Sequence, residues 1–124
     1  MLREINGVRQ KDENRIRRWF EDDYFDLIVW YDAHRNFVGF QLCYDRFGKE
    51  HALTWHKNRG FTHDKVSTGF DEFHTLATPV LVSDGPFPYD DICARFRKSS
   101  SDMDQDVAGL VLDKLEEYAG KRSA

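Results

Sequence analysis

The chain has 124 residues, of which 40% are hydrophobic and 32% charged, as is typical of a single globular domain. Its 22 acidic and 18 basic residues give a formal net charge of −4, which excludes a general electrostatic attraction to nucleic acid or anionic lipid. No run reaches the ~18 consecutive apolar residues that a membrane-spanning helix needs. The chain starts with polar and acidic residues where a signal peptide has an apolar stretch, so we expect a cytoplasmic protein.

Residues 12–20 fit two different structures. Their apolar residues have the spacing of a short helix, but Trp19 and Phe20 also fit a strand that leads directly into the segment after them. In a strand, Arg18 would point toward the apolar face of the sheet, which costs free energy. We favour the strand and keep the helix as the alternative.

Residues 25–56 alternate between apolar and polar side chains, which predicts two consecutive β-hairpins. The first hairpin pairs Phe25–Asp32 with Phe37–Asp45 around a turn at residues 33–36, and the second hairpin turns at residues 46–49. A shift of one residue would mix polar side chains into the apolar face, so the register is well specified. The predicted apolar pairs are Tyr31 with Val38, Val29 with Phe40, Leu27 with Leu42, Phe25 with Tyr44, Leu42 with Leu53, and Phe40 with Trp55.

The C-terminal third predicts two helices that cover this apolar face. A helix with Asp102 as N-cap has an apolar stripe at helical spacing, and a shorter helix is expected over residues 88–98. Residues 78–83 fit a short strand, whereas residues 57–76 lack clear periodicity and are expected to form a loop. The predicted fold is α+β: one domain over residues 1–124, with an antiparallel β-meander of four to five strands and one face packed by two C-terminal helices.

The opposite face of the predicted sheet is the candidate functional surface. It combines apolar and aromatic side chains with hydroxyl, amide and imidazole groups, a mixture that suits a protein interface or a shallow site. Trp30 is expected to lie over the backbone of Gly39. A structural alternative is that N-terminal residues or the 57–76 loop cover this face as a second core. The residues of this face are Ile28, Trp30, Phe37, Gly39, Gln41, Cys43, Ala52, Thr54 and His56.

A pocket between this face and the 57–76 loop is the alternative to a protein interface. Such a pocket would have Trp30 as its apolar wall and a few polar groups to orient a ligand. Those polar residues are Gln41, Thr54, His56 and His63.

The histidines lack the close spacing of a typical metal site. His56, His63 and His74 would converge only if the loop folded back over the second face, and zinc ligands usually show tighter local spacing. We therefore predict neither a metal ion nor a cofactor.

No motif for catalysis stands out in the sequence. The chain has no Gly-x-Ser-x-Gly nucleophile motif and no glycine-rich phosphate loop. Cys43 and Cys93 lack the context of a catalytic thiol, and we expect both to be reduced and buried. The Arg-Arg-Trp-Phe stretch at residues 17–20 mixes charge with rings as single-strand nucleic-acid binders do, but acidic residues follow at once at residues 21–23.

Three strings in the predicted strands resemble a group of small bacterial proteins with no assigned activity. The strings are Asp26-Leu-Ile-Val-Trp-Tyr-Asp, Gly39-Phe-Gln-Leu-Cys-Tyr-Asp and Ala52-Leu-Thr-Trp, and the resemblance covers residues 17–96. It implies a bacterial cytosolic origin, and it provides no catalytic residue.

The sequence therefore predicts a non-catalytic interaction or adaptor domain. Its partner would be another protein, or a second copy in a homodimer, bound through the second face. A small-ligand-binding protein or an enzyme with the pocket described above is the first alternative, and a single-stranded nucleic-acid binder is the second. The candidate binding residues are Ile28, Trp30, Gln41, Thr54, His56 and His63.

Overall fold

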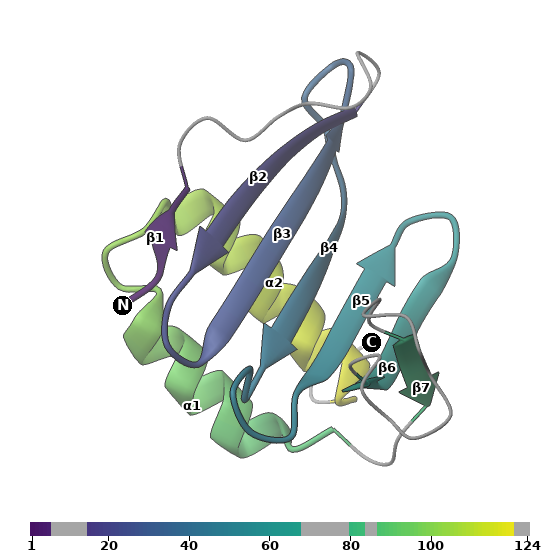
Figure 1. Cartoon of the computed structure of the whole chain (residues 1–124). Helices are drawn as coiled ribbons and strands as arrows, with labels where there is room; N and C mark the ends of the chain where they lie inside the picture. Colours follow the sequence, from purple (N-terminus) through teal and green to yellow (C-terminus); the bar gives the residue numbers. More distant parts are fainter. Residues whose placement is uncertain (6–14, 68–79, 84–86, 121–124) are drawn as a thin grey trace.

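The protein is an antiparallel β-meander with two helices on one face (Figure 1). The computed structural model describes residues 1–5, 15–67, 80–83 and 87–120. Within these ranges, seven strands form one sheet in which each strand pairs with the next along the chain. The strands are β1 (Arg3–Glu4), β2 (Arg15–Glu21), β3 (Phe25–Asp32), β4 (Phe37–Tyr44), β5 (His51–His56), β6 (Gly60–Ser67) and β7 (Val80–Ser83).

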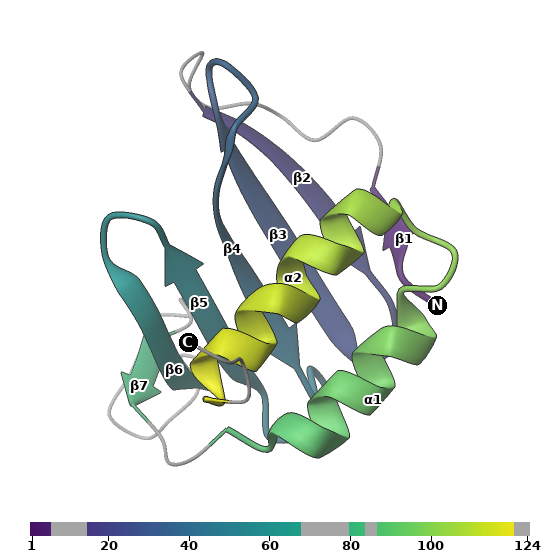
Figure 2. The same ribbon diagram turned by 180° about the vertical axis from the view of Figure 1, so that it is seen from behind.

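Two helices follow the strands, α1 (Tyr89–Ser99) and α2 (Gln105–Tyr118). Both lie on the same face of the sheet, and α2 crosses the strands diagonally (Figure 2). Figure 1 therefore looks onto the other face, on which no helix of the described residues lies. The predicted α+β class, the antiparallel meander and its two covering helices are confirmed.

The sheet has more strands than the four to five that the sequence predicted. The N-terminal segment contributes β1 and β2, so the strand alternative for residues 15–20 is the correct one. The predicted loop at residues 57–76 was wrong for its first part, because β6 pairs along its length with β5. Residues 68–76 lie outside the described residues.

The hairpin register follows the prediction except beside the β3–β4 turn. Asp32 donates its backbone N–H to the carbonyl of Asn36 (3.0 Å), and Arg35 has a φ of 64°, which leaves a three-residue loop. A β-bulge then makes Tyr31 pair with Phe37, so the predicted pairing of Tyr31 with Val38 was wrong.

The bulge also exchanges the faces of two side chains. The ring of Phe37 stacks on Trp55 at 5.5 Å on the helix-covered face, although Phe37 was predicted on the other side. Val38 lies beside Trp30 on the second face instead. The remaining predicted apolar pairs have the predicted register.

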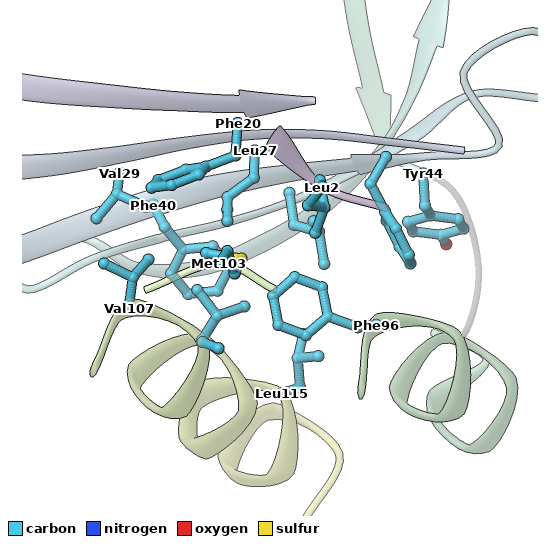
Figure 3. Packing of buried hydrophobic residues seen from close by; sticks show 14 of the residues in the cluster. Leu2, Phe20, Leu27, Val29, Phe40, Tyr44, Phe96, Met103, Val107 and Leu115 are labelled. Atoms are coloured by element: carbon cyan, nitrogen blue, oxygen red, sulfur yellow. The ribbon is translucent and has the colours of Figure 1, made fainter. Parts of the chain in front are cut away.

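The core lies between the sheet and the two helices (Figure 3). α1 begins directly after Pro88 and is shifted by one residue from the predicted range of 88–98. α2 begins two residues later than predicted, because Asp104 rather than Asp102 accepts a hydrogen bond from the backbone N–H of Asp106 (2.9 Å). The fully buried side chains include Leu27, Val29, Phe40, Leu42 and Leu53 from the sheet, and Ile92, Phe96, Val107, Val111 and Leu115 from the helices.

Candidate functional site

The second face, defined as the sheet face away from α1 and α2, has an ordered arrangement of side chains. Cross-strand pairing aligns its residues in three rows that run across the strands, because residues two apart on a strand share a face. The acidic row is Glu21, Asp26, Cys43, Ala52 and Asp64; the middle row is Trp19, Ile28, Gln41, Thr54 and Thr62; the Trp30 row is Arg17, Trp30, Gly39, His56 and Gly60.

Five of the six predicted binding residues lie together on the second face. Ile28, Gln41 and Thr54 are consecutive in the middle row, so each lies directly opposite its neighbour across a strand pair. Trp30 and His56 flank Gly39 in the next row.

The sixth predicted residue, His63, lies on the opposite face. It pairs with Leu53 of the core, is 7% exposed, and its Nε2 is 2.6 Å from the hydroxyl of Tyr44. Its ring also stacks near His51 and meets Phe87 edge-on. The predicted pocket that combined His63 with Gln41, Thr54 and His56 is therefore not formed, because β6 directs His63 toward the helices.

The predicted contact between Trp30 and Gly39 is present. A Cβ atom on Gly39 would lie 3.1 Å from Cε3 of Trp30 and 2.5 Å from the backbone oxygen of Trp55. The indole therefore lies against the backbone of Gly39, and any residue with a side chain at this position would obstruct that contact. This contact fixes the position of the Trp30 ring at one end of the second face.

A groove of about 500 Å³ lies beside Trp30, between β3 and the β5–β6 turn. His56 forms part of its wall, and its Nδ1 accepts a hydrogen bond from the backbone N–H of Asn58 (3.2 Å). In a neutral imidazole the proton is then on Nε2. The turn is closed by Gly60, whose φ of 77° favours glycine. The lining residues are Trp30, Val38, Thr54, His56, Asn58, Arg59, Gly60 and Thr62.

Thr54 lies at the base of this region. Its hydroxyl oxygen is buried and, in the part of the chain that the structure describes, has no hydrogen-bond partner. A buried hydroxyl without a partner costs about 1–3 kcal/mol.

The other end of the second face carries partly buried carboxylates. Burial raises the pKa of Asp26, while a hydrogen bond from the Trp19 indole N–H lowers it in part. Burial also raises the pKa of Glu50, and the nearby charge of Asp26 adds to this shift. Arg46 donates to Glu21 at 3.3 Å on the same side.

Cys43 lies in the acidic row, and its thiol has low reactivity. Burial raises the pKa of its thiol to about 12, and the charges of Glu50 and Asp26 contribute to the same shift. The thiol is therefore protonated at neutral pH and is a poor nucleophile. Both cysteines are free thiols, as predicted; Cys93 is buried as expected, whereas Cys43 is only partly buried.

The sequence prediction missed the residues that β2 and β6 contribute to the second face. Arg17 and Trp19 belong to it because β2 pairs with β3, and Thr62 and Asp64 belong to it because β6 pairs with β5. The alternation of Arg17, Trp19 and Glu21 was the available signal once residues 15–21 were taken as a strand.

Two further observations apply to the described residues alone. No three His, Cys, Asp or Glu side chains among them are arranged to hold a metal ion, and His74 lies outside the described ranges. Neither α1 nor α2 is long and apolar enough to cross a membrane.

Comparison with known proteins gives no relative: no protein family, no curated protein and no solved structure matches the chain. The resemblance to small bacterial proteins therefore stays a prediction.

Proposed function

We propose that the protein is a non-catalytic interaction domain that binds a protein partner through the second face. The observation that carries this proposal is the asymmetry of the sheet: both described helices cover one face, whereas Trp19, Ile28 and Trp30 on the other face remain partly exposed. The uncovered face of an antiparallel sheet is usually polar. Aromatic side chains on such a face are typical anchors of protein interfaces.

The polar groups around these anchors support the same proposal. Gln41 and Thr62 border the apolar side chains of the middle row and can hydrogen-bond a partner. The groove beside Trp30 adds a concave feature that could accept a side chain of the partner. Apolar anchors bordered by hydrogen-bonding groups are the usual composition of an interface.

We place this interaction in the cytoplasm. Cys43 and Cys93 are both free thiols, and such thiols persist in a reducing compartment.

The groove itself favours a second candidate function, the binding of a small ligand. Its volume of about 500 Å³ is in the usual range of ligand pockets, and Trp30, His56 and Arg59 provide a ring, an imidazole and a cation. Native mass spectrometry of the untagged protein distinguishes the two candidates, because a retained small mass would favour the ligand.

The interaction function is tested by a double variant, Ile28→Ser with Trp30→Ala, used as bait in a quantitative pull-down. The matched control carries Ala94→Ser with Arg97→Ala, two exposed positions on α1. We expect the wild type and the control to retain the same proteins and the second-face variant to lose them. Circular dichroism checks that all three are folded. The untagged chain is added to the lysate, so that a second copy can be retained as well. An unchanged profile for the second-face variant would then remove the proposal.

A further inference from the structure

The second face is electrically polarised along the direction of its strands. At one end, Asp26 and Asp64 in the acidic row lie near Glu50, and no ion pair joins these three carboxylates to a described residue. Arg46 also lies at this end, where its ion pair is with Glu21, so the three carboxylates outweigh its charge. Arg17 and Arg59 lie at the other end, in and beside the Trp30 row. The two ends are separated by about 13 Å, the length of four strand residues.

The middle row between these ends is uncharged and is complementary to itself. Ile28 offers an apolar side chain, and the Gln41 amide is both a hydrogen-bond donor and an acceptor. The same is true of the Thr62 hydroxyl. A row of this composition can pack against an identical row without leaving two donors or two charges facing each other.

Two stacked copies of such a face can be related by a two-fold axis in either of two main orientations. An axis along the strands would place the acidic row on the acidic row, where like charges repel. An axis across the strands, parallel to the middle row, places the acidic end of each copy over the cationic end of the other. The second orientation joins opposite charges twice, because a two-fold interface repeats every contact.

We propose that the partner of the second face is a second copy of this chain, packed face to face about a two-fold axis that runs across the strands at the middle row. This inference rests on the interaction function proposed above and names its partner. In this arrangement Arg59 of each copy lies over Glu50 and Asp64 of the second copy. Ile28 and Gln41 lie over their own equivalents.

The face is small for a dimer interface. The strands β2 to β6 are spaced ~4.8 Å apart and carry three rows ~7 Å apart, which gives a patch of about 500 Å² on each copy. Interfaces of this size are weak, so we expect a dissociation constant of about 1 μM or higher. Stacking of two twisted sheets with a moderate angle between their strands is a common packing mode.

The test uses charge reversal at Arg59 and Asp64, with sedimentation velocity over about 1–500 μM protein as the readout. Arg59→Glu places acid against acid in both copies, and Asp64→Arg places base against base. We expect each variant alone to dimerise at least about tenfold more weakly than the wild type. Lys98→Glu, on the exposed side of α1, is the matched control and should dimerise like the wild type.

Two combinations make the test specific for this geometry. An equimolar mixture of the Arg59→Glu and Asp64→Arg chains should form a heterodimer, because each position then meets the opposite charge. A chain that carries both substitutions should dimerise with itself for the same reason. Loss of dimer in the single variants with recovery in both combinations supports the proposal.

Three results would overturn it: a wild type that is monomeric throughout, a dimer that the single variants do not weaken, or combinations that do not recover. A monomeric wild type whose second-face double variant still loses its pull-down partners would mean that another protein occupies the face. The interaction function would then stand and this inference would fail. If the wild type is monomeric and the pull-down profile of the double variant is also unchanged, both the interaction function and the dimer inference fail.

Discussion

Arg18 joins the sheet to the first turn of α2: its Nη1 donates to a carboxylate oxygen of Asp104 at 3.0 Å. Its Nε and Nη2 donate to the Glu4 carboxylate of β1 at 2.9 and 2.7 Å. The guanidinium also lies over the ring of Phe20, 5.1 Å from its centroid. A charged residue on the helix-covered face of β2 is thus accommodated at the margin of the core, where two carboxylates and a ring surround it.

Replacement of Arg18 by methionine should destabilise the protein by about 1 kcal/mol at pH 7, a value that allows for solvent screening of these partly exposed groups. The hydrogen bonds from Arg18 lower the pKa of both Glu4 and Asp104. A carboxyl whose pKa is lowered by folding stabilises the protein at pH values above its unfolded-state pKa. This stabilisation is lost as the pH falls through the folded-state pKa. Urea denaturation should therefore show a difference between wild type and Arg18→Met that is constant near neutral pH and shrinks below about pH 4. A difference that persists undiminished at low pH would indicate lost packing rather than lost ion pairs.

The sequence predicted the centre of the sheet because its alternation admits one register. Phe40 and Leu42 have apolar partners on both sides, so any shift would expose them. β6 was missed because its core position is occupied by His63, a polar residue whose burial depends on its hydrogen bond to Tyr44. The bulge at Val38 depends on the loop that Arg35 closes, and residue alternation contains no information about loop closure.

The candidate site, like the fold, was predictable for the central strands and not for the margins of the sheet. The parity of positions within β3, β4 and β5 was enough to bring Ile28, Gln41 and Thr54 onto one face. The place of His63 required the register between β5 and β6, which the sequence did not supply. The polarised charge of the second face also depends on pairing at both margins of the sheet, between β2 and β3 and between β5 and β6.

Two glycine substitutions should change stability in opposite directions. A Cβ at position 39 would lie 2.5 Å from the Trp55 backbone oxygen and 3.3 Å from Cα of His56. Gly39→Ala must therefore shift the β4–β5 backbone and should cost about 1–3 kcal/mol. Gly109 is exposed on α2 with no atom within 4 Å of an added Cβ, so Gly109→Ala should add about 1 kcal/mol from helix propensity. Chemical denaturation of the two variants measures both effects, and a neutral Gly39→Ala would contradict the close approach of the strands.

Truncation of the sheet core should be far more costly than truncation of an exposed ring. Phe40 and Leu42 are fully buried in mid-strand, so Phe40→Ala and Leu42→Ala should each cost about 2–5 kcal/mol. Phe47 in the β4–β5 turn is 81% exposed, and Phe47→Ala should cost less than about 0.5 kcal/mol. Urea denaturation measures the free energy of unfolding of each of the three variants relative to the wild type. A loss below about 1 kcal/mol for both core variants would overturn the assignment of faces.

The Cys43 thiol should resist alkylation in the folded protein. With its pKa raised to about 12, about one molecule in 10⁴ carries the thiolate at pH 8. Iodoacetamide should therefore label Cys43 about three orders of magnitude more slowly than an unburied thiol, as followed by intact mass. Cys43→Ala identifies any signal that comes from Cys93, and labelling in urea shows that both thiols react once the chain unfolds. Rapid native labelling of Cys43 would mean that the acidic row is more open than its burial indicates.

Asp26 offers a way to stabilise the protein at neutral pH. Burial raises the pKa of this carboxyl, so folding favours its protonated form and the charged form costs stability above the folded-state pKa. Asp26→Asn removes the charge but keeps a side-chain oxygen that can accept the hydrogen bond from Trp19. We expect a higher urea midpoint than wild type at pH 7 and an equal midpoint near pH 3, where the wild-type carboxyl is protonated in both states. Dilute protein keeps self-association out of the comparison, and Asp26→Ala, which leaves Trp19 without this acceptor, should fall below Asp26→Asn. A lower midpoint for Asp26→Asn at pH 7 would show that the charge stabilises the fold, through the attraction of Arg46.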